Sequence, residues 1–300
     1  MFPAKTLASL RVIGTVVLFI VASPAHAQSE NRSAPPSNAT AASRIIAIGG
    51  DITEILYAIG ADTRVIAVDA TSQFPPEALK EKKNIGYMRA LSTEGVLSVN
   101  GDLIIASDRT GPPEVVKALK TAPVKYIEIA DDFSPASVAN KAREVARAAG
   151  FDAAGDKLAS RIERDFATLA ELRKQIGKPA RVLFVLNVVN GRVMVGGSHS
   201  SADAILKLAG AENAAAAVNG YKPVSDEALV EIRPDAIVSM SRSGNHDTAQ
   251  ITSIKGLSAS PAVKNKRIIQ MDGLYLLGFG PRAPAAALDL MRRLYPQLSR

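Results

Sequence analysis

Short apolar segments alternate with helical patterns along most of the chain, and this alternation restricts the fold more than any other feature. Runs of aliphatic residues, four to six long, predict buried strands, because strands of parallel sheets are covered on both faces. In the first half of the chain they lie at 45–48, 65–68, 103–106 and 124–129. Strands that alternate with helices predict parallel βαβ units.

The middle of the chain departs from this order. Residues 135–149 and 152–176 both have helical spacing, and no strand is predicted between them. A helix over 152–176 would be about 37 Å long at 1.5 Å per residue, comparable to the width of a small domain. The alternation then resumes with strands at 181–186 and 192–195, a helix at 201–209 and a final helix near 283–295.

Two segments that lie 133 positions apart, 92–105 and 225–238, repeat one pattern. In each, a serine N-cap begins a two-turn helix with glutamate at its second position, and a polar turn ending in aspartate leads into an apolar strand. We therefore expect an α/β fold of two Rossmann-like lobes joined by a long bridging helix, with a ligand cleft between the lobes. The predicted boundaries are 44–150 for the first lobe, 151–177 for the bridging helix and 178–300 for the second lobe.

The first 27 residues have the pattern of a secretory signal peptide. Lys5 and Arg11 precede the apolar run 12–22, and a small-x-small cleavage site ends at Ala27. The run is too short for a stable membrane span, so we expect cleavage after Ala27 and a soluble periplasmic protein. Residues 28–43 are polar and rich in proline and serine, which is typical of a flexible leader. No cysteine follows the cleavage site, which predicts a free protein and not a lipoprotein.

The composition restricts the chemistry further. The chain has 47% apolar and 22% charged residues, which excludes a mainly disordered protein. The absence of cysteine excludes disulfides and thiolate metal sites. Without the two cations of the signal peptide the net charge is 34 − 29 = +5. This charge suits an anionic small ligand, but it equally describes an ordinary basic exported protein.

The motifs of common enzyme classes are missing. The sequence has no Gly-x-Ser-x-Gly, no His-Glu-x-x-His and no Gly-x-x-x-x-Gly-Lys-Ser/Thr. Once His26 is removed with the signal peptide, His199 and His246 are too few for a three-histidine zinc site. We therefore expect a binding protein and not an enzyme, with an exported hydrolase as a remote alternative. No nucleic-acid partner is expected.

The segment 84–95 holds the most local information. Tyr87 follows a glycine, which lets a flat ligand approach closely, and Arg89 comes two residues later. In an extended loop these two side chains would face the same way. The loop precedes the helix capped by Ser92, at the lobe edge where a cleft would open. Spacing alone favours the alternative, a tyrosine packed on the lobe surface and a solvated arginine.

The run Gly-Tyr-Met-Arg-Ala-Leu-Ser-Thr-Glu-Gly over 86–95 resembles the signature of periplasmic haem-binding proteins of bacterial ABC haem importers (the HmuT, PhuT and ShuT type). Segments 111–115 and 276–282 resemble that family too, and the similarity extends from about Arg44 to the C-terminus. The resemblance implies a class III periplasmic binding protein, with the helical backbone of metal receptors. It also implies delivery of haem b (hemin) to an inner-membrane ABC permease and its ATPase. We expect a monomer. Other proteins of this fold carry cobalamin or ferric siderophores, and these remain the alternative ligands.

Within this resemblance, Tyr87 is expected to be the axial ligand of the haem iron. Ferric haem accepts a tyrosine phenolate as an axial ligand. A free tyrosine has a pKa near 10, so the metal and a neighbouring cation must favour the deprotonated form. Arg89 is placed to supply that charge, or a hydrogen bond to the phenolate.

Two further residues are candidates for haem contacts. His199, in a glycine-rich turn that enters a helix of the second lobe, is a possible ligand of a second, stacked haem, or simply a polar residue at a helix N-terminus. Arg282 has the paired donors that bind a propionate, and a structural ion pair is the equal alternative. Leu274, Tyr275, Leu276, Leu277 and Phe279 are expected to form an apolar wall for the porphyrin, or else strand and core.

Glu94 and Glu227 occupy matching positions in the two repeated segments. In this class of binding protein, one exposed glutamate on each lobe is thought to dock onto arginines of the permease, which is the role we expect for this pair. The alternative is local, because an acid in the first turn of a helix gains about 0.3–1 kcal/mol from the helix dipole.

Overall fold

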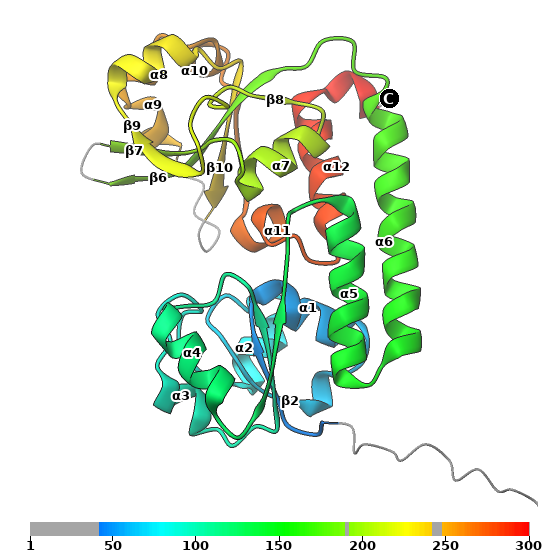
Figure 1. Cartoon of the computed structure of the whole chain (residues 1–300). Helices are drawn as coiled ribbons and strands as arrows, with labels where there is room; N and C mark the ends of the chain where they lie inside the picture. Colours follow the sequence, from blue (N-terminus) through cyan, green and yellow to red (C-terminus); the bar gives the residue numbers. More distant parts are fainter. Residues whose placement is uncertain (1–41, 190–191, 242–247, 300) are drawn as a thin grey trace, which may run out of the picture. The chain divides into compact units, whose positions relative to one another are not determined.

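The computed structural model describes residues 42–189, 192–241 and 248–299. Two lobes, each built on its own sheet, are connected through a pair of helices (Figure 1). The sheet of the first lobe has the strand order β3-β2-β1-β4-β5, and all neighbouring strands in it are parallel. Its strands are β1 (Ile45–Ile48), β2 (Val65–Val68), β3 (Lys83–Asn84), β4 (Leu103–Ser107) and β5 (Lys125–Ile129).

The first sheet is covered on both faces, as its apolar strands predict. Every residue of the neighbouring strands β1 and β4 is buried. Alternate residues of these strands belong to two separate apolar clusters, one shared with α1 and α5 and the other with α3 and α4. The helices of this lobe are α1 (Gly50–Ala58), α2 (Pro76–Glu81), α3 (Thr93–Leu97) and α4 (Pro113–Thr121), and α5 (Pro135–Ala149) follows β5.

The second sheet is mixed, with the strand order β11-β10-β6-β7-β9 and β8 paired to β6. The expected parallel pairing holds for β6, β10 and β11, but β7 pairs antiparallel with both β6 and β9. Only two residues separate β6 from β7, which is too few for the crossover that a parallel pair needs. The strands are β6 (Arg181–Val189), β7 (Arg192–Gly196), β8 (Glu212–Asn213), β9 (Tyr221–Val224), β10 (Ala236–Ser241) and β11 (Ile268–Asp272).

The helices of the second lobe are mostly short. They are α7 (Ser201–Leu208), α8 (Asp226–Ile232), α9 (Ala249–Thr252), α10 (Pro261–Lys264), α11 (Gly273–Leu277) and α12 (Ala283–Leu294). Among the described residues, no helix combines the length and the apolar character needed to cross a bilayer.

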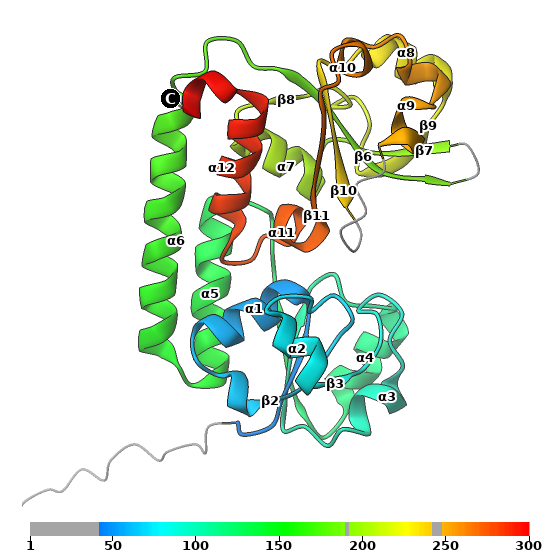
Figure 2. The same cartoon turned by 180° about the vertical axis from the view of Figure 1, so that it is seen from behind.

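The predicted long helix is α6 (Asp152–Arg173), which ends three residues earlier than expected. It packs beside α5, and Figures 1 and 2 show it running alongside both lobes. The two helices approach so closely that a Cβ atom added to Gly155 would lie 2.2 Å from the Cβ of Ala146. One apolar cluster includes Ile45 of the first sheet, Phe166 of α6 and Val182 of the second sheet. A continuous core therefore joins the lobes.

The repeated segments fold alike. Ser92 and Ser225 cap α3 and α8 by accepting hydrogen bonds from the amides of Gly95 (3.1 Å) and Ala228 (3.3 Å). The aspartate that ends the polar turn of each repeat also has the same role in both lobes. Asp102 accepts from the Arg44 amide just before β1 (3.1 Å), and Asp235 accepts from the Arg181 amide at the start of β6 (3.0 Å). Each aspartate thereby fixes the loop before its own strand to the start of the neighbouring strand.

A buried ion cluster lies where the first lobe meets the second. The side chain of Lys141 on α5 is 1% exposed, and its ammonium contacts the carboxylates of Asp51 on α1 and Asp131 after β5. The same ammonium donates to the Phe279 carbonyl of the second lobe at 3.2 Å. Burial alone would raise the pKa of Asp51, but the charges of Lys141 and Arg109 outweigh it and hold this pKa below its usual value.

Candidate functional site

A cavity of about 1090 Å³ lies between the two lobes. Its volume is at the upper end of the range for small-molecule sites, so it suits a large ligand. Residues that follow the carboxyl ends of the parallel strands line it from both sides, among them Asp51 after β1 and Asp272 at the end of β11. This is the edge at which ligands bind in open parallel sheets.

The Tyr87 segment is a tight turn and not the extended loop expected from the sequence. The Ala90 amide donates to the Tyr87 carbonyl at 2.8 Å, which closes the turn. Before it, Gly86 has a φ of +99° and donates its amide to the Asn84 side chain at 2.8 Å. The Gly111 amide holds the turn from the neighbouring loop by donating to the Met88 carbonyl at 2.9 Å.

This turn directs Tyr87 and Arg89 toward the cavity, as expected, although for a different geometric reason. Tyr87 is 47% exposed and Met88 only 7%, so the turn presents the phenol and buries the thioether. Arg89 lines the same cavity. Burial raises the pKa of the Tyr221 phenol on the opposite wall, and its hydrogen bonds with Ser201 and Ala202, together with the charge of Arg89, only partly oppose that rise.

His199 lies on the wall contributed by the second lobe. It directly precedes Ser200, the N-cap of α7, and its φ is +58°. Its Nδ1 lies 3.2 Å from the Asn219 Oδ1. A neutral imidazole that donates from Nδ1 to this amide oxygen keeps its lone pair on Nε2. Tyr87 and His199 thus line one cavity from opposite lobes, whereas His26 and His246 lie outside the described residues.

Arg282 does not line this cavity. Its Nε and Nη2 donate to the two carboxylate oxygens of Glu54 on α1, each at 2.9 Å. The guanidinium also stacks on Phe74, 3.5 Å from the ring centroid. Burial raises the pKa of Glu54, and the bonds and charge of Arg282 only partly oppose that rise. The structure therefore favours the structural ion pair, which links the lobes, over a ligand contact.

The predicted apolar wall is divided between cavity and core. Leu274 and Leu277 line the cavity, whereas Leu276 and Phe279 are almost fully buried. Tyr275 donates its hydroxyl to Asp289 at 2.8 Å. Residues 273–277 form α11 and not a strand.

Sequence reasoning missed two polar side chains of the cavity. Tyr221 places its hydroxyl 2.8 Å from the Ser201 hydroxyl and accepts from the Ala202 amide at 3.1 Å. Arg109 lines the opposite wall with a quarter of its side chain exposed. Neither residue belongs to a motif, and only the tertiary fold brings them to the cleft.

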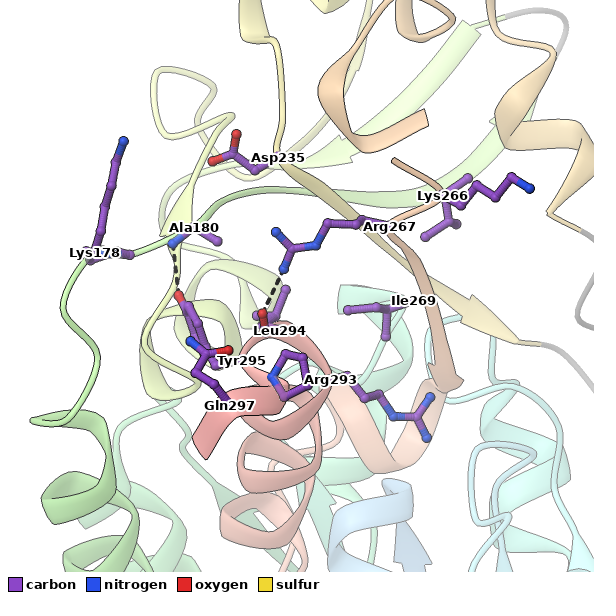
Figure 3. A pocket seen from close by; sticks show the side chains of 13 residues that line it. Lys178, Ala180, Asp235, Lys266, Arg267, Ile269, Arg293, Leu294, Tyr295 and Gln297 are labelled. Atoms are coloured by element: carbon purple, nitrogen blue, oxygen red, sulfur yellow. Dashed lines mark hydrogen bonds between the residues drawn. The ribbon is translucent and has the colours of Figure 1, made fainter. Parts of the chain in front are cut away.

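A second cavity of about 660 Å³ lies at the amino ends of β6 and β11, on the edge opposite the cleft (Figure 3). Its lining is basic, but Lys178, Lys266 and Arg293 point in different directions. Arg267 is engaged with the Leu294 carbonyl at 2.7 Å. These cations do not converge on a common point, so the cavity between the lobes is the better candidate.

Comparison with known proteins agrees with this architecture. The sequence pattern described as "Periplasmic binding protein" matches residues 45–274. The chain belongs to the periplasmic binding protein family. It is a substrate-binding protein of an ABC transporter and not an enzyme.

Individual relatives of this binding protein differ in ligand. The structure of the periplasmic heme-binding protein BhuT in complex with two hemes is 36% identical, with a TM-score of 0.79, over 85% of this chain and 98% of that one. An uncharacterized ABC transporter substrate-binding lipoprotein, YvrC of Bacillus subtilis, is 27% identical over 84% of this chain and 80% of its own length. A vitamin B12-binding protein of Pectobacterium carotovorum is 26% identical over 65% of this chain and 70% of its own.

Glu94 and Glu227 of the binding protein are exposed near the N-termini of α3 and α8. Figure 1 shows both helices on the side away from α5 and α6. Hydrogen bonds from its own amide and from Ser225 lower the pKa of Glu227. The favourable local interaction of an acid at a helix N-terminus is therefore present at Glu227. The carboxylate nevertheless stays exposed on the surface.

We expect Arg282→Gln to lower the free energy of unfolding by about 2–3 kcal/mol at pH 7, because it leaves Glu54 buried without a cation. Burial raises the pKa of Glu54. The folded variant therefore binds a proton more readily than the unfolded chain, and the deficit shrinks as the pH falls toward 4. Urea unfolding at pH 7 and at pH 4 measures the loss of unfolding free energy in the variant. The double variant Glu54→Gln/Arg282→Gln is the control and should recover most of the loss. A deficit that is independent of pH and not rescued would contradict the ion-pair role.

Proposed function

We propose that this protein captures haem b (hemin) in the cavity between its lobes and delivers it to an inner-membrane ABC permease and its ATPase. The observation that carries the proposal is the half-exposed phenol of Tyr87 on the cavity wall, with Arg89 on the same turn. The 36% identity to a heme-binding protein over nearly that protein's whole length supports it.

The chemistry of the cavity fits an iron porphyrin as cargo. Tyr87 would bind the ferric iron as a phenolate, a known axial ligand of haem. Arg89 would stabilise the phenolate charge from within the same turn. Met88, which is 7% exposed, offers apolar contact from the first lobe, and Leu274 and Leu277 offer it from the other lobe. An apolar wall with a few convergent polar groups is typical of sites for large cofactors.

His199 would serve as the ligand of a second haem stacked on the first. Its Nδ1 faces Asn219, so Nε2 is the ring nitrogen that would bind the metal. The cavity volume of about 1090 Å³ and the two-heme complex of BhuT support this extension.

Cobalamin or a ferric siderophore is the alternative ligand, and the similarity to vitamin B12-binding proteins favours it. The two proposals differ in what they require of Tyr87, since only iron coordination needs the phenol oxygen. A purified protein that binds ferric chelates or cobalamin but not haemin would establish the alternative.

The proposal places the protein in the periplasm, after export by the signal peptide and cleavage following Ala27. There Glu94 and Glu227 would dock onto the permease, one from each lobe. The continuous core and the Glu54–Arg282 pair restrain the lobes, so we propose that capture needs only a small relative motion.

We expect Tyr87→Phe to abolish the phenolate-to-iron charge-transfer band of the haem complex and to weaken haemin binding at least about 10-fold. Absorption spectra recorded with added ferric haemin measure both effects. Tyr57→Phe is the matched control, because Tyr57 does not line the cavity and its hydroxyl has no hydrogen-bond partner in the structure. An unchanged spectrum in Tyr87→Phe would reject the ligand assignment.

A haemin titration tests His199 separately. We expect the unaltered protein to reach its endpoint at two haems per chain and His199→Ala to reach it at one, since only the second site loses its ligand. A clean one-to-one endpoint for the unaltered protein would remove the second haem while leaving Tyr87 in place.

Charge reversal tests the docking role. Glu94→Lys and Glu227→Lys should each lower haem uptake several-fold in cells while leaving haemin affinity unchanged, because a surface charge steers association. Glu171→Lys, on the exposed end of α6, is the control for the change in net charge. Normal uptake by both variants would contradict docking through these residues.

A further inference from the structure

Arg109 is held beside the Tyr87 turn by backbone hydrogen bonds. The loop after β4 folds back on itself, with the Thr110 amide donating to the Ser107 carbonyl at 3.0 Å. Gly111, two residues past Arg109, both donates to Met88 (2.9 Å) and accepts from the Leu91 amide (3.2 Å). The loop that carries Arg109 and the turn that carries Tyr87 are therefore one bonded unit on the cavity wall.

The guanidinium of Arg109 faces three carboxylates, at longer range than the contacts that the ammonium of Lys141 makes. It lies 3.4 Å from the Asp131 carboxylate, 3.6 Å from that of Asp51 and 4.0 Å from that of Asp108. Lys141 contacts the same oxygens of Asp51 and Asp131 directly. Of the five N–H donors on a guanidinium, the hydrogen bonds of the described residues use one on Arg109, at 3.4 Å. Its side chain is 25% exposed and stacks on Phe133, 4.9 Å from the ring centroid.

The described part of the lining has one acid besides Asp51, and that acid is already engaged. It is Asp272, whose carboxylate accepts from the Tyr275 amide at 2.8 Å as the N-cap of α11. A guanidinium that is three-quarters buried and has unused donors can bind a carboxylate through two parallel hydrogen bonds.

We infer that Arg109 binds a carboxylate of the ligand, which, resting on the proposed function, is a propionate of haem. The role differs from the one proposed for Arg89, which is to stabilise the Tyr87 phenolate. Arg109 sets the position of the acidic edge of the ligand, whereas Tyr87 sets the position of the metal.

The test compares haemin with haemin dimethyl ester, which keeps the iron and loses both carboxylates. Arg109→Gln should bind haemin about 10- to 100-fold more weakly, the range expected for a lost charged hydrogen bond. The same variant should bind the dimethyl ester as the unaltered protein does, and its charge-transfer band should be unchanged. Arg161→Gln, an exposed position on α6, is the matched control and should bind both forms normally.

Each other outcome overturns the inference. Equal weakening of both forms by Arg109→Gln would mean that Arg109 only supports Asp51 and Asp131, and unaltered haemin binding would mean that it does not meet the ligand. If the unaltered protein binds neither form, the proposed haem function fails and this role of Arg109 fails with it. A protein that binds both forms equally well keeps the haem function and rejects the carboxylate contact.

Discussion

The ammonium of Lys141 is the contact on which the site depends. It is buried between Asp51 and Asp131 and also reaches the Phe279 carbonyl, so it connects α1, α5, the segment after β5 and the second lobe. Burying charges is costly unless each is paired, and removing one member of such a cluster leaves a charge without compensation. The cluster therefore fixes the wall of the cavity at the point where Asp51 and Arg109 line it.

The lobes are held together by more than this cluster. One apolar core passes from the first sheet through α5 and α6 to the second sheet, and the Glu54–Arg282 pair crosses the same boundary. A cavity between lobes that are held in this way is largely formed before its ligand arrives. Less ordering is then required on binding, which favours affinity.

Local sequence patterns were sufficient to predict most of the fold. The strands β1 and β2 and the helix α5 have the predicted bounds. Apolar runs and capping residues determine such bounds, and both lie within a few positions of the element. The antiparallel pairing of β7 was missed, although the short connection after β6 already excluded a parallel crossover. The direction of Tyr87 was right but its loop was not extended, because the bond from Gly111 that shapes the turn comes from another segment.

Only residues with a local sequence signal were expected at the cleft. Tyr87 and Arg89 of the motif and His199 of the glycine-rich turn line one cavity, whereas Arg109 and Tyr221 carry no local signal. Arg282 could not be placed from sequence, because its partner Glu54 lies 228 positions away. Pairings over such separations follow from the packing of the lobes and leave no trace in periodicity or spacing.

The two lobes present equivalent helices at their surface, because in each lobe an aspartate binds the start of the neighbouring strand. Asp102 and Asp235 fix the starts of the strands that follow α3 and α8. Hydrogen bonds within each lobe therefore hold both helices in position. If the permease holds both helices, attachment of one raises the effective concentration of the other. Two contacts of this kind, one on each lobe, would then hold the protein more firmly than either would alone.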